Sequence, residues 1–294
     1  MIDLDDFEIA ARHAMAIRKM IHESELLTTQ APELANKSLL DENVARLPRW
    51  PSGFYSDFDA LLEGFCGLTV LAGPGGSGKS THAMACALEN ALSPSTCVAY
   101  FDAENALGDQ IVRARSWWGS DADFRSNMQA MALRFHWFEV LPGHSWQQLM
   151  QTLAQRVLLD HERVLLVFDS MFSIARCFGG NTLDVCSKMY LALVSLVRRS
   201  EGRIRVLALS EMNKDGGVKG LEGVYAATLA LMLTPDAEKG ENIVHLKMLK
   251  NRSGPLRRDL GFYEIDSATN RMRKTADDAQ ASYRGNPDPY GVEH

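Results

Sequence analysis

The chain lacks the features of a secreted, disulfide-bonded or membrane-spanning protein. Its five cysteines, Cys66, Cys86, Cys97, Cys177 and Cys186, are odd in number and form no CxxC pair. Neither a disulfide framework nor a zinc knuckle is therefore expected, and a reducing cytoplasm fits best. No apolar run approaches the roughly 20 residues that cross a bilayer. The N-terminal sequence MIDLDDFEIA is acidic where a signal peptide is positive, so export is not expected.

An excess of positive charge is also missing. Lys and Arg total 31 against 37 for Asp and Glu, a net charge of −6. That balance argues against a broad surface that coats nucleic acid, while it leaves a narrow basic path open. The 294 residues make one large domain or two small ones, and a content of 46% hydrophobic and 23% charged residues excludes a mostly disordered chain.

Three regions are expected along the chain. Residues 1–48 form a helical arm and a polar linker, because apolar residues recur at helical spacing between Phe7 and Ile21. Residues 49–274 are dense in apolar segments and make the folded domain. Residues 275–294 carry Pro, Gly and Asn without an apolar period, which predicts a flexible tail.

Short apolar runs alternate with longer helical patterns in the folded domain. The runs span residues 67–73, 96–102, 163–169, 203–210 and 227–233, and the helical patterns span 81–92, 145–159 and 183–200. Strands that are apolar throughout are typical of a sheet covered by helices on both faces. The pattern predicts an α/β fold with a mainly parallel twisted sheet, closed by antiparallel strands at 241–251 and 259–266.

One motif is specific for phosphate binding. The sequence GPGGSGKS matches GxxxxGK[ST] and lies between an apolar run and a helical pattern, as the motif requires. Glycines let the backbone turn its N–H groups onto phosphate oxygens, and the following helix presents its positive end to the same anion. The expected nucleotide-binding residues are Gly73, Pro74, Gly75, Gly76, Ser77, Gly78, Lys79, Ser80 and Thr81. Lys79 would contact the β- and γ-phosphates, and Ser80 would be a Mg²⁺ ligand.

Acidic residues at two other strand ends complete the expected ATP and Mg²⁺ site. Asp169 ends the run 163–169 and is expected in the metal shell. Asp102 and Glu104 follow the run 96–102, one strand over from the phosphate loop. Glu104 is the better candidate to activate water, because Asp102 can instead orient neighbouring groups.

Four segments resemble RecA-fold ATPases. FDAENALGD (101–109) looks like the strand end that carries the catalytic glutamate of RecA-type recombinases. Residues 49–81 are similar to the opening of the core in DnaB-type replicative helicases and RadA-type ATPases. Residues 206–220 resemble the strand and loop that follow in DnaB-type and RepA-type helicases, and 245–255 resemble their late Lys-x-Arg strand. The resemblance covers about residues 49 to 266 and implies a RecA-like core.

The resemblance implies further residue roles. Lys250 and Arg252 match the pair that reaches the neighbouring subunit's γ-phosphate in hexameric helicases, which implies a homo-oligomeric ring or filament with ATP between subunits. Glu211 departs from the pattern, because the helicases carry Gln there and the RadA and RepA types carry His. That departure puts γ-phosphate sensing at this position in doubt, unless Asn213 or Lys214 takes it over.

A path for single-stranded DNA is expected from the same resemblance. In the RecA fold, two loops line that path, and here they correspond to 176–184 and 213–223. Arg176, Lys214 and Lys219 would contact phosphates. The plain alternative is that both loops are only connectors.

The expected function is a Mg²⁺-ATP-dependent DNA motor, most similar to a hexameric replicative helicase core that translocates on single-stranded DNA. A RecA/RadA-like recombination ATPase that forms filaments, and a nucleotide-gated scaffold without a DNA role, remain as alternatives. Replication or recombination proteins are the expected further partners, and the short N-terminal region suits a phage- or plasmid-encoded protein. Trp117 and Trp118 are either a partner contact or helix-end packing.

Overall fold

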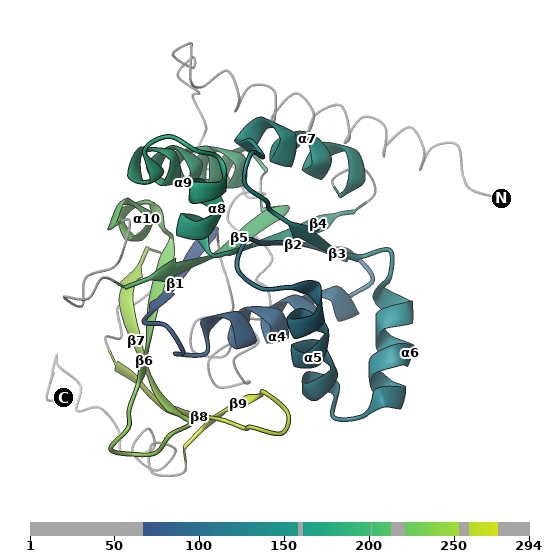
Figure 1. Cartoon of the computed structure of the whole chain (residues 1–294), viewed down its shortest axis with the longest axis vertical. Helices are drawn as coiled ribbons and strands as arrows, with labels where there is room; N and C mark the ends of the chain where they lie inside the picture. The colour runs from purple at the N-terminus through teal and green to yellow at the C-terminus, as the bar shows by residue number, and fades with distance from the viewer. Residues whose placement is uncertain (1–66, 158–160, 201, 213–220, 253–258, 276–294) are drawn as a thin grey trace, which may run out of the picture.

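The computed structural model describes residues 67–157, 161–200, 202–212, 221–252 and 259–275, and Figure 1 draws the other segments as a grey trace. The predicted arm at 1–48 lies outside the described residues, as does the predicted tail apart from Thr275. The two domain boundaries therefore stay predictions.

One sheet organises the described residues. Its strands follow the order β3-β2-β4-β5-β1-β6-β7-β8-β9. The strands are β1 (Leu68–Gly73), β2 (Thr96–Asp102), β3 (Phe135–Glu139), β4 (Arg163–Asp169), β5 (Ile204–Glu211), β6 (Leu229–Pro235), β7 (Ile243–Asn251), β8 (Asp259–Ile265) and β9 (Met272–Lys274). Pairing is parallel from β3 to β6 and antiparallel from β6 to β9. The predicted mainly parallel sheet with antiparallel closing strands is confirmed.

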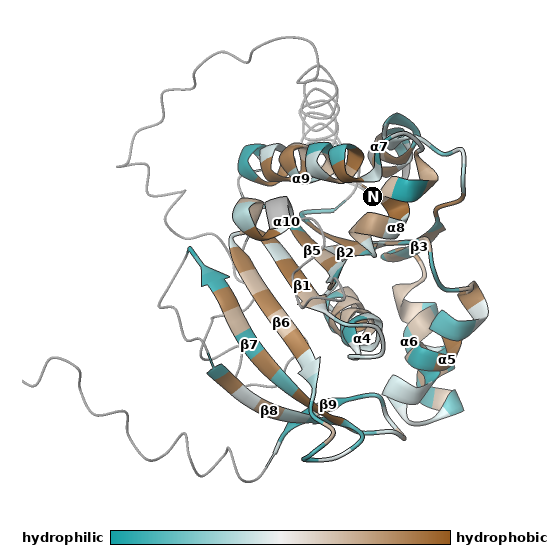
Figure 2. Cartoon of the chain, turned by 60° about the vertical axis from the view of Figure 1, so that its left-hand side comes forward, coloured by the Kyte–Doolittle hydropathy of each residue, from teal (hydrophilic) through white to brown (hydrophobic). Residues whose placement is uncertain are grey.

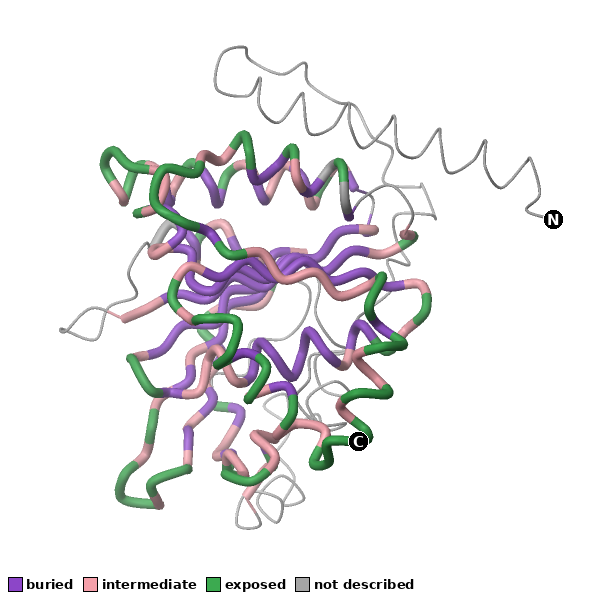
Figure 3. The backbone as a smooth tube through the Cα atoms, turned by 45° about the vertical axis from the view of Figure 1, so that its right-hand side comes forward, coloured by how far each residue is buried: buried purple, intermediate pink, exposed green. Residues whose placement is uncertain are grey.

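Helices cover the parallel part of the sheet on both faces (Figure 1). They are α4 (Lys79–Leu92), α5 (Leu107–Trp118), α6 (Asp121–Met131), α7 (Trp146–Arg156), α8 (Met171–Cys177), α9 (Thr182–Arg199) and α10 (Leu221–Ala226). Residues of α7, α8 and α9 share one apolar core with the sheet, and residues of α4, α5 and α6 share the other. The molecule is thus a three-layer α/β structure, as Figure 3 shows by the buried strands between two layers.

The side chains of β2 show how the two cores are separated. Every residue of β2 is buried. Ala99 and Phe101 belong to the core on the α7–α9 side, whereas Val98 and Tyr100 belong to the core on the α4 side. This alternation follows from the two-residue period of a strand. It places the Tyr100 ring in the same layer as α4, the helix that follows the phosphate loop. Figure 2 shows the hydrophobic residues along the central strands in brown.

The edge strand β3 was not predicted from the sequence. Its sequence, FHWFE, mixes aromatic residues with His136 and Glu139 and is only partly buried, so it lacks the continuous apolar run of the central strands. His136 and Trp137 both lie in this strand. The three-residue strand β9 was also missed, and the predicted bounds of β5 and β6 were one or two residues too early.

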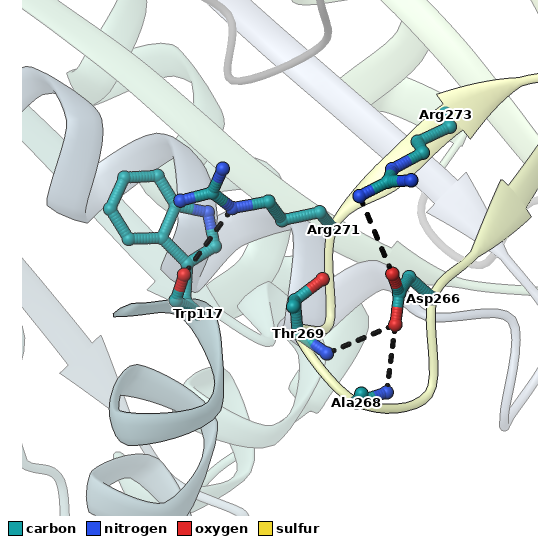
Figure 4. A network of polar contacts seen from close by, with 6 residues as sticks. All are labelled: Trp117, Asp266, Ala268, Thr269, Arg271 and Arg273. Carbon is teal, nitrogen blue, oxygen red and sulfur yellow. Dashed lines mark hydrogen bonds and ion pairs between the residues drawn. The ribbon is translucent and has the colours of Figure 1, made fainter. Parts of the chain in front are cut away.

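Trp117 lies at the C-terminal end of α5 and packs within its own chain. The Arg271 guanidinium lies over the Trp117 ring, 4.9 Å from its centroid, and its Nε donates to the Trp117 carbonyl at 3.3 Å. The Trp118 ring meets the Trp117 ring edge-on at 4.4 Å. Figure 4 shows the contact of Arg271 with Trp117 beside the β8–β9 turn, where Asp266 accepts from the backbone of Thr269. The helix-end interpretation accounts for both tryptophans.

Arg271→Ala is expected to lower the free energy of unfolding by about 1–2 kcal/mol, because it removes a cation–π contact and a hydrogen bond. Chemical denaturation measures this change. Arg273→Ala on the same turn is the control: its side chain is 61% exposed and its ion pair with Asp266 spans 3.6 Å. The control is expected to lose less than about 0.5 kcal/mol. Equal losses for the two variants would contradict the proposed anchoring by Arg271.

Candidate nucleotide-binding site

The glycine-rich loop connects β1 to α4. Gly76 has a φ of 75° and Gly78 a φ of 82°, values in the left-handed region that favours glycine. Gly78 is the N-cap of α4, and no side chain caps this helix, so its first N–H groups are left for an anion. A Cβ atom built on Gly75 or Gly76 would meet nothing within 4 Å, whereas one on Gly78 would lie 2.5 Å from Ile265 Cδ1. The loop is open on one side and held by β8 on the other.

The Ser77 side chain supports the same interpretation of the loop. Ser77 is fully buried, and its hydroxyl has no hydrogen-bond partner among the described residues. A buried hydroxyl without a partner costs free energy, which a ligand of the loop can recover by accepting a hydrogen bond. A phosphate oxygen is such an acceptor, so the loop fits a phosphate chain.

Lys79, at the first position of α4, turns back onto the loop. Its Nζ donates to the carbonyl oxygens of Gly73 at 2.9 Å and Pro74 at 2.8 Å. Burial lowers the pKa of Lys79, and the nearby carboxylates of Glu211, Asp169 and Glu104 oppose that change. The lysine therefore lies at the centre of the acidic groups that the sequence singled out.

Ser80 and Asp169, the two predicted metal ligands, are in direct contact. The Ser80 hydroxyl donates to Asp169 Oδ1 at 3.1 Å, and the Tyr100 hydroxyl donates to Asp169 Oδ2 at 2.8 Å. Burial, followed by repulsion from Asp102, raises the pKa of Asp169 to about 7, against the two hydrogen bonds that lower it. A cation would relieve this crowding of carboxylates, so the donor set fits Mg²⁺.

The described part of the chain holds no group of three His, Cys, Asp or Glu side chains that could bind a metal ion. A Mg²⁺ ion here would need ligands from Ser80, Asp169 and the phosphates of its nucleotide. Such a ligand set differs from a site in which the protein supplies every metal ligand, and it agrees with a metal ion that binds together with its nucleotide.

The raised pKa of Asp169 predicts that the difference in stability between the Asp169→Asn variant and the wild type depends on pH. The folded-state value of about 7 exceeds the ordinary value of 3.8. The folded state thus keeps a proton that the unfolded state releases, and this stabilisation is lost as the pH rises through the folded pKa. Without divalent cations, Asp169→Asn is expected to be more stable than the wild type at about pH 8, with a smaller difference at about pH 5.

Urea unfolding in chelator at both pH values measures this difference. Glu238→Gln is the matched control, because it removes one negative charge from an exposed turn. An Asp169→Asn variant whose stability advantage does not grow with pH would contradict the proposed cause.

Asp102 and Glu104 have different surroundings. Asp102 is fully buried, and its carboxylate accepts from the backbone N–H groups of Glu104 and Asn105, both at 2.9 Å, and from the side chain of Gln110. Glu104 is exposed at the end of the turn that Asp102 holds. Asp102 therefore orients neighbouring groups, and Glu104 is the accessible carboxylate.

The predicted position of Glu104 one strand over from the phosphate loop was wrong. Two strands, β4 and β5, lie between β2 and β1. The loop reaches toward β4 through the contact of Ser80 with Asp169, and Glu104 contacts Ser170, the residue after Asp169, at 2.7 Å. The end of β4 thus joins the two halves of the site.

Glu211 lies beside the start of the loop. It ends β5 and pairs in register with Gly73. An acidic residue at this place adds to the negative charge around Lys79. The proposed substitutes Asn213 and Lys214, and the predicted DNA contact Lys219, lie outside the described residues.

Lys250 and Arg252 both reach the C-terminal end of α10. Lys250 Nζ donates to the carbonyl oxygens of Val224, at 3.0 Å, and Tyr225, and Arg252 Nη2 donates to the same Tyr225 oxygen at 2.8 Å. Burial and the charge of Arg252 lower the pKa of Lys250. The two side chains project together, as their alternate positions on the chain predict, and they cap a helix of their own subunit.

Arg176 was predicted within a loop that begins at residue 176, and this was wrong. It lies in the last turn of α8, where it is exposed, and only residues 178–181 separate α8 from α9. Phe178 packs against the core on the α8 side, whereas the Tyr225 side chain is 70% exposed at the end of α10. Of these two aromatic side chains, that of Tyr225 is thus the more accessible.

Sequence reasoning missed the hydroxyl groups that surround the carboxylates. Tyr100, Ser170 and Ser173 donate to Asp169 or Glu104. A tyrosine inside an otherwise apolar strand, two positions before an acidic strand end, is the only signal that the sequence offered. A pocket of about 480 Å³ between β3 and α7 includes no residue of the glycine-rich loop, although Phe101 of β2 helps to line it.

Comparisons with known proteins show the fold. No family model matches the sequence, and no curated protein matches it. The structure is similar to that of a KaiC-like protein from the hyperthermophilic archaeon Pyrococcus horikoshii OT3, with a TM-score of 0.59 and 20% identity over 77% of this chain and 98% of that chain. The chain has a RecA-like core, as predicted. Within the described ranges, no helix is long and apolar enough to cross a membrane.

Proposed function

We propose that the protein is a Mg²⁺-dependent ATPase that works as a DNA motor, in the manner of a hexameric replicative helicase core that translocates on single-stranded DNA. The observation that carries the ATPase part is the contact of Ser80 with Asp169 beside the loop lysine Lys79. The glycine-rich loop, the Ser80–Asp169 contact and the exposed carboxylate of Glu104 lie near one another at one end of the sheet, and this supports the proposal.

The chemistry follows from these residues. Bound Mg²⁺-ATP would supply the phosphate chain and a metal ion that balances its charge. Lys79 and the N–H groups at the start of α4 would hold the phosphates, and Ser80 with Asp169 would hold the metal ion. Glu104 accepts a proton from the attacking water as the bond between the β- and γ-phosphates breaks, which leaves ADP and phosphate.

Oligomerisation and DNA binding are the less direct parts of the proposal. Lys250 and Arg252 are close enough to act together, and an arginine supplied by a neighbouring subunit stabilises transition-state charge and couples hydrolysis to assembly. Exposed Arg176 can contact phosphates, and exposed Tyr225 can stack on a base. These features support a polymer path beside the nucleotide sites.

The test is the ATPase rate with and without single-stranded DNA, combined with sizing in a non-hydrolysable ATP analogue. Stimulation that weakens as salt rises, together with a ring-sized assembly and unwinding of a forked duplex, is expected. Strand exchange without unwinding would favour a recombinase that forms filaments. ATP turnover that does not respond to DNA would contradict the DNA motor and favour a nucleotide-gated scaffold.

A further inference from the structure

Two serine hydroxyls converge on the carboxylate of Glu104. Ser170 Oγ donates to Glu104 Oε1 at 2.7 Å, and Ser173 Oγ donates to the same oxygen. The Ser170 and Ser173 Oγ atoms lie 3.2 Å apart. We propose that Ser170 and Ser173 are positioning residues that hold Glu104 in the orientation needed to activate water. This inference rests on the proposed ATPase function.

The backbone and the side chain of Glu104 are held by different groups. The Glu104 N–H donates to buried Asp102, which fixes the turn after β2. An exposed glutamate on a fixed backbone still has three side-chain torsions, which no feature of the turn restrains. The two serine hydroxyls restrain these torsions, because both donate to Glu104 Oε1 from the N-terminal end of α8.

Because both serines bond to the Oε1 atom of Glu104, its Oε2 atom is left available. Both serine hydroxyls act on Oε1, and within the described ranges no hydrogen bond to the Glu104 Oε2 atom accompanies them. A carboxylate that is anchored through one oxygen presents its second oxygen in a defined direction. A general base needs such a direction, because proton transfer requires a hydrogen bond to the attacking water.

The serines also tie the base to the metal ligand. Ser170 directly follows Asp169 at the end of β4, is itself buried, and caps the N-terminus of α8 by accepting from the Ser173 N–H. The strand end that positions the metal ligand therefore positions the base as well. The pairing of β2 with β4 brings the two strand ends together, and the Ser170–Glu104 hydrogen bond adds a direct side-chain link between the base and the residue next to the metal ligand. A precise site requires this kind of support.

The experiment compares Ser170→Ala, Ser173→Ala and the double variant with the wild type. Each single change is expected to lower kcat about tenfold, and the double change about a hundredfold, with KM for ATP within about twofold, because a base displaced by about 1 Å loses rate on that scale. Ser173→Thr keeps the hydroxyl and is expected to restore most of the rate. Ser195→Ala on α9 is the control, because Ser195 lies outside the site.

A double-mutant cycle with Glu104→Ala separates positioning from general structural damage. In the Glu104→Ala background the serine substitutions are expected to change the residual single-turnover rate less than twofold, because the group that they position is gone. Thermal unfolding and the binding of a fluorescent ATP analogue are measured on every variant. Binding is expected to match the parent protein, and only the variants that carry Ser170→Ala, which lose the cap of α8, are expected to unfold at a somewhat lower temperature.

Three results would overturn the inference. One is the same rate loss in the Glu104→Ala background as in the wild type, and another is an unchanged or raised kcat in the double serine variant. The third is an absence of ATP turnover in the wild type, which also overturns the proposed function. Turnover that is normal and insensitive to the serines overturns the positioning role alone.

Discussion

Lys79→Ala is expected to lower ATP turnover about 10²–10³-fold, the loss that follows removal of one preorganised charge donor from an active site. Lys79 lies at the first position of α4 with its Nζ on the Gly73 and Pro74 carbonyl oxygens. Lys79 is the only lysine in the loop sequence GPGGSGKS, so no other lysine of the loop can take its place at a phosphate. ATP affinity is expected to fall as well, because the lysine binds the ground state too. Steady-state phosphate release and nucleotide titration measure the two effects.

The control for this prediction is Lys188→Ala on α9, an exposed lysine away from the loop. It removes one positive charge and keeps the site intact, so full turnover is expected. Lys79→Arg tests the shape of the donor, because a planar guanidinium does not replace a compact ammonium inside a tight loop. Full ATP turnover by Lys79→Ala would contradict the catalytic part of the proposed function.

Glu104→Gln is expected to lower kcat about 10²–10⁴-fold and to leave ATP binding close to that of the wild type, because an amide keeps the size of the side chain and cannot accept a proton. Glu104 is the exposed carboxylate of the pair, whereas Asp102 is buried and its carboxylate accepts hydrogen bonds from neighbouring groups. Single-turnover hydrolysis measures the chemical step, and a trapped ATP complex is the expected companion result.

Asp109→Asn is the matched control for Glu104→Gln. Asp109 is an exposed acid in the first turn of α5, so its replacement removes the same charge near the same turn without touching the proposed base. A full rate for Glu104→Gln together with a loss for Asp102→Asn would reverse the roles of the two carboxylates.

The sequence predicted the parts of the site that are continuous in the chain. The glycine-rich loop and Asp169 were predicted because each depends on a local pattern, a motif in one case and an apolar strand with an acidic end in the other. The shape of the loop and the end of the strand are each set by residues that are neighbours in the chain. Local signals were therefore sufficient for these elements.

The relative placement of the parts was beyond the sequence. Which strands separate β1 from β2 is decided by long-range pairing, and the insertion of β4 and β5 between them has no local signature. The hydroxyl of Tyr100 shows the same limit, because a tyrosine in an apolar strand also fits an ordinary core position. Its role depends on Asp169, which is adjacent only once β2 and β4 have paired.

The hairpin of β8 and β9 was predicted only in part, and its contacts not at all. Residues 259–266 were predicted to be a closing strand, but the sequence did not predict that Ile265 packs beside Gly78 or that Arg271 lies on Trp117. Neither contact involves residues that are close in the chain. Both are nevertheless made to elements that flank the nucleotide-binding site, namely the loop before α4 and the end of α5.

The contact of Ile265 with Gly78 has a consequence for the order of folding. During synthesis the glycine-rich loop is made early and β8 is made late. Ile265 of β8, which packs against Gly78, is therefore absent while most of the core is synthesised. Contacts between such distant residues form slowly, because a long segment must be closed first. A nascent chain that has reached α9 carries the complete phosphate-binding motif, but it does not yet carry the side chain that packs against Gly78.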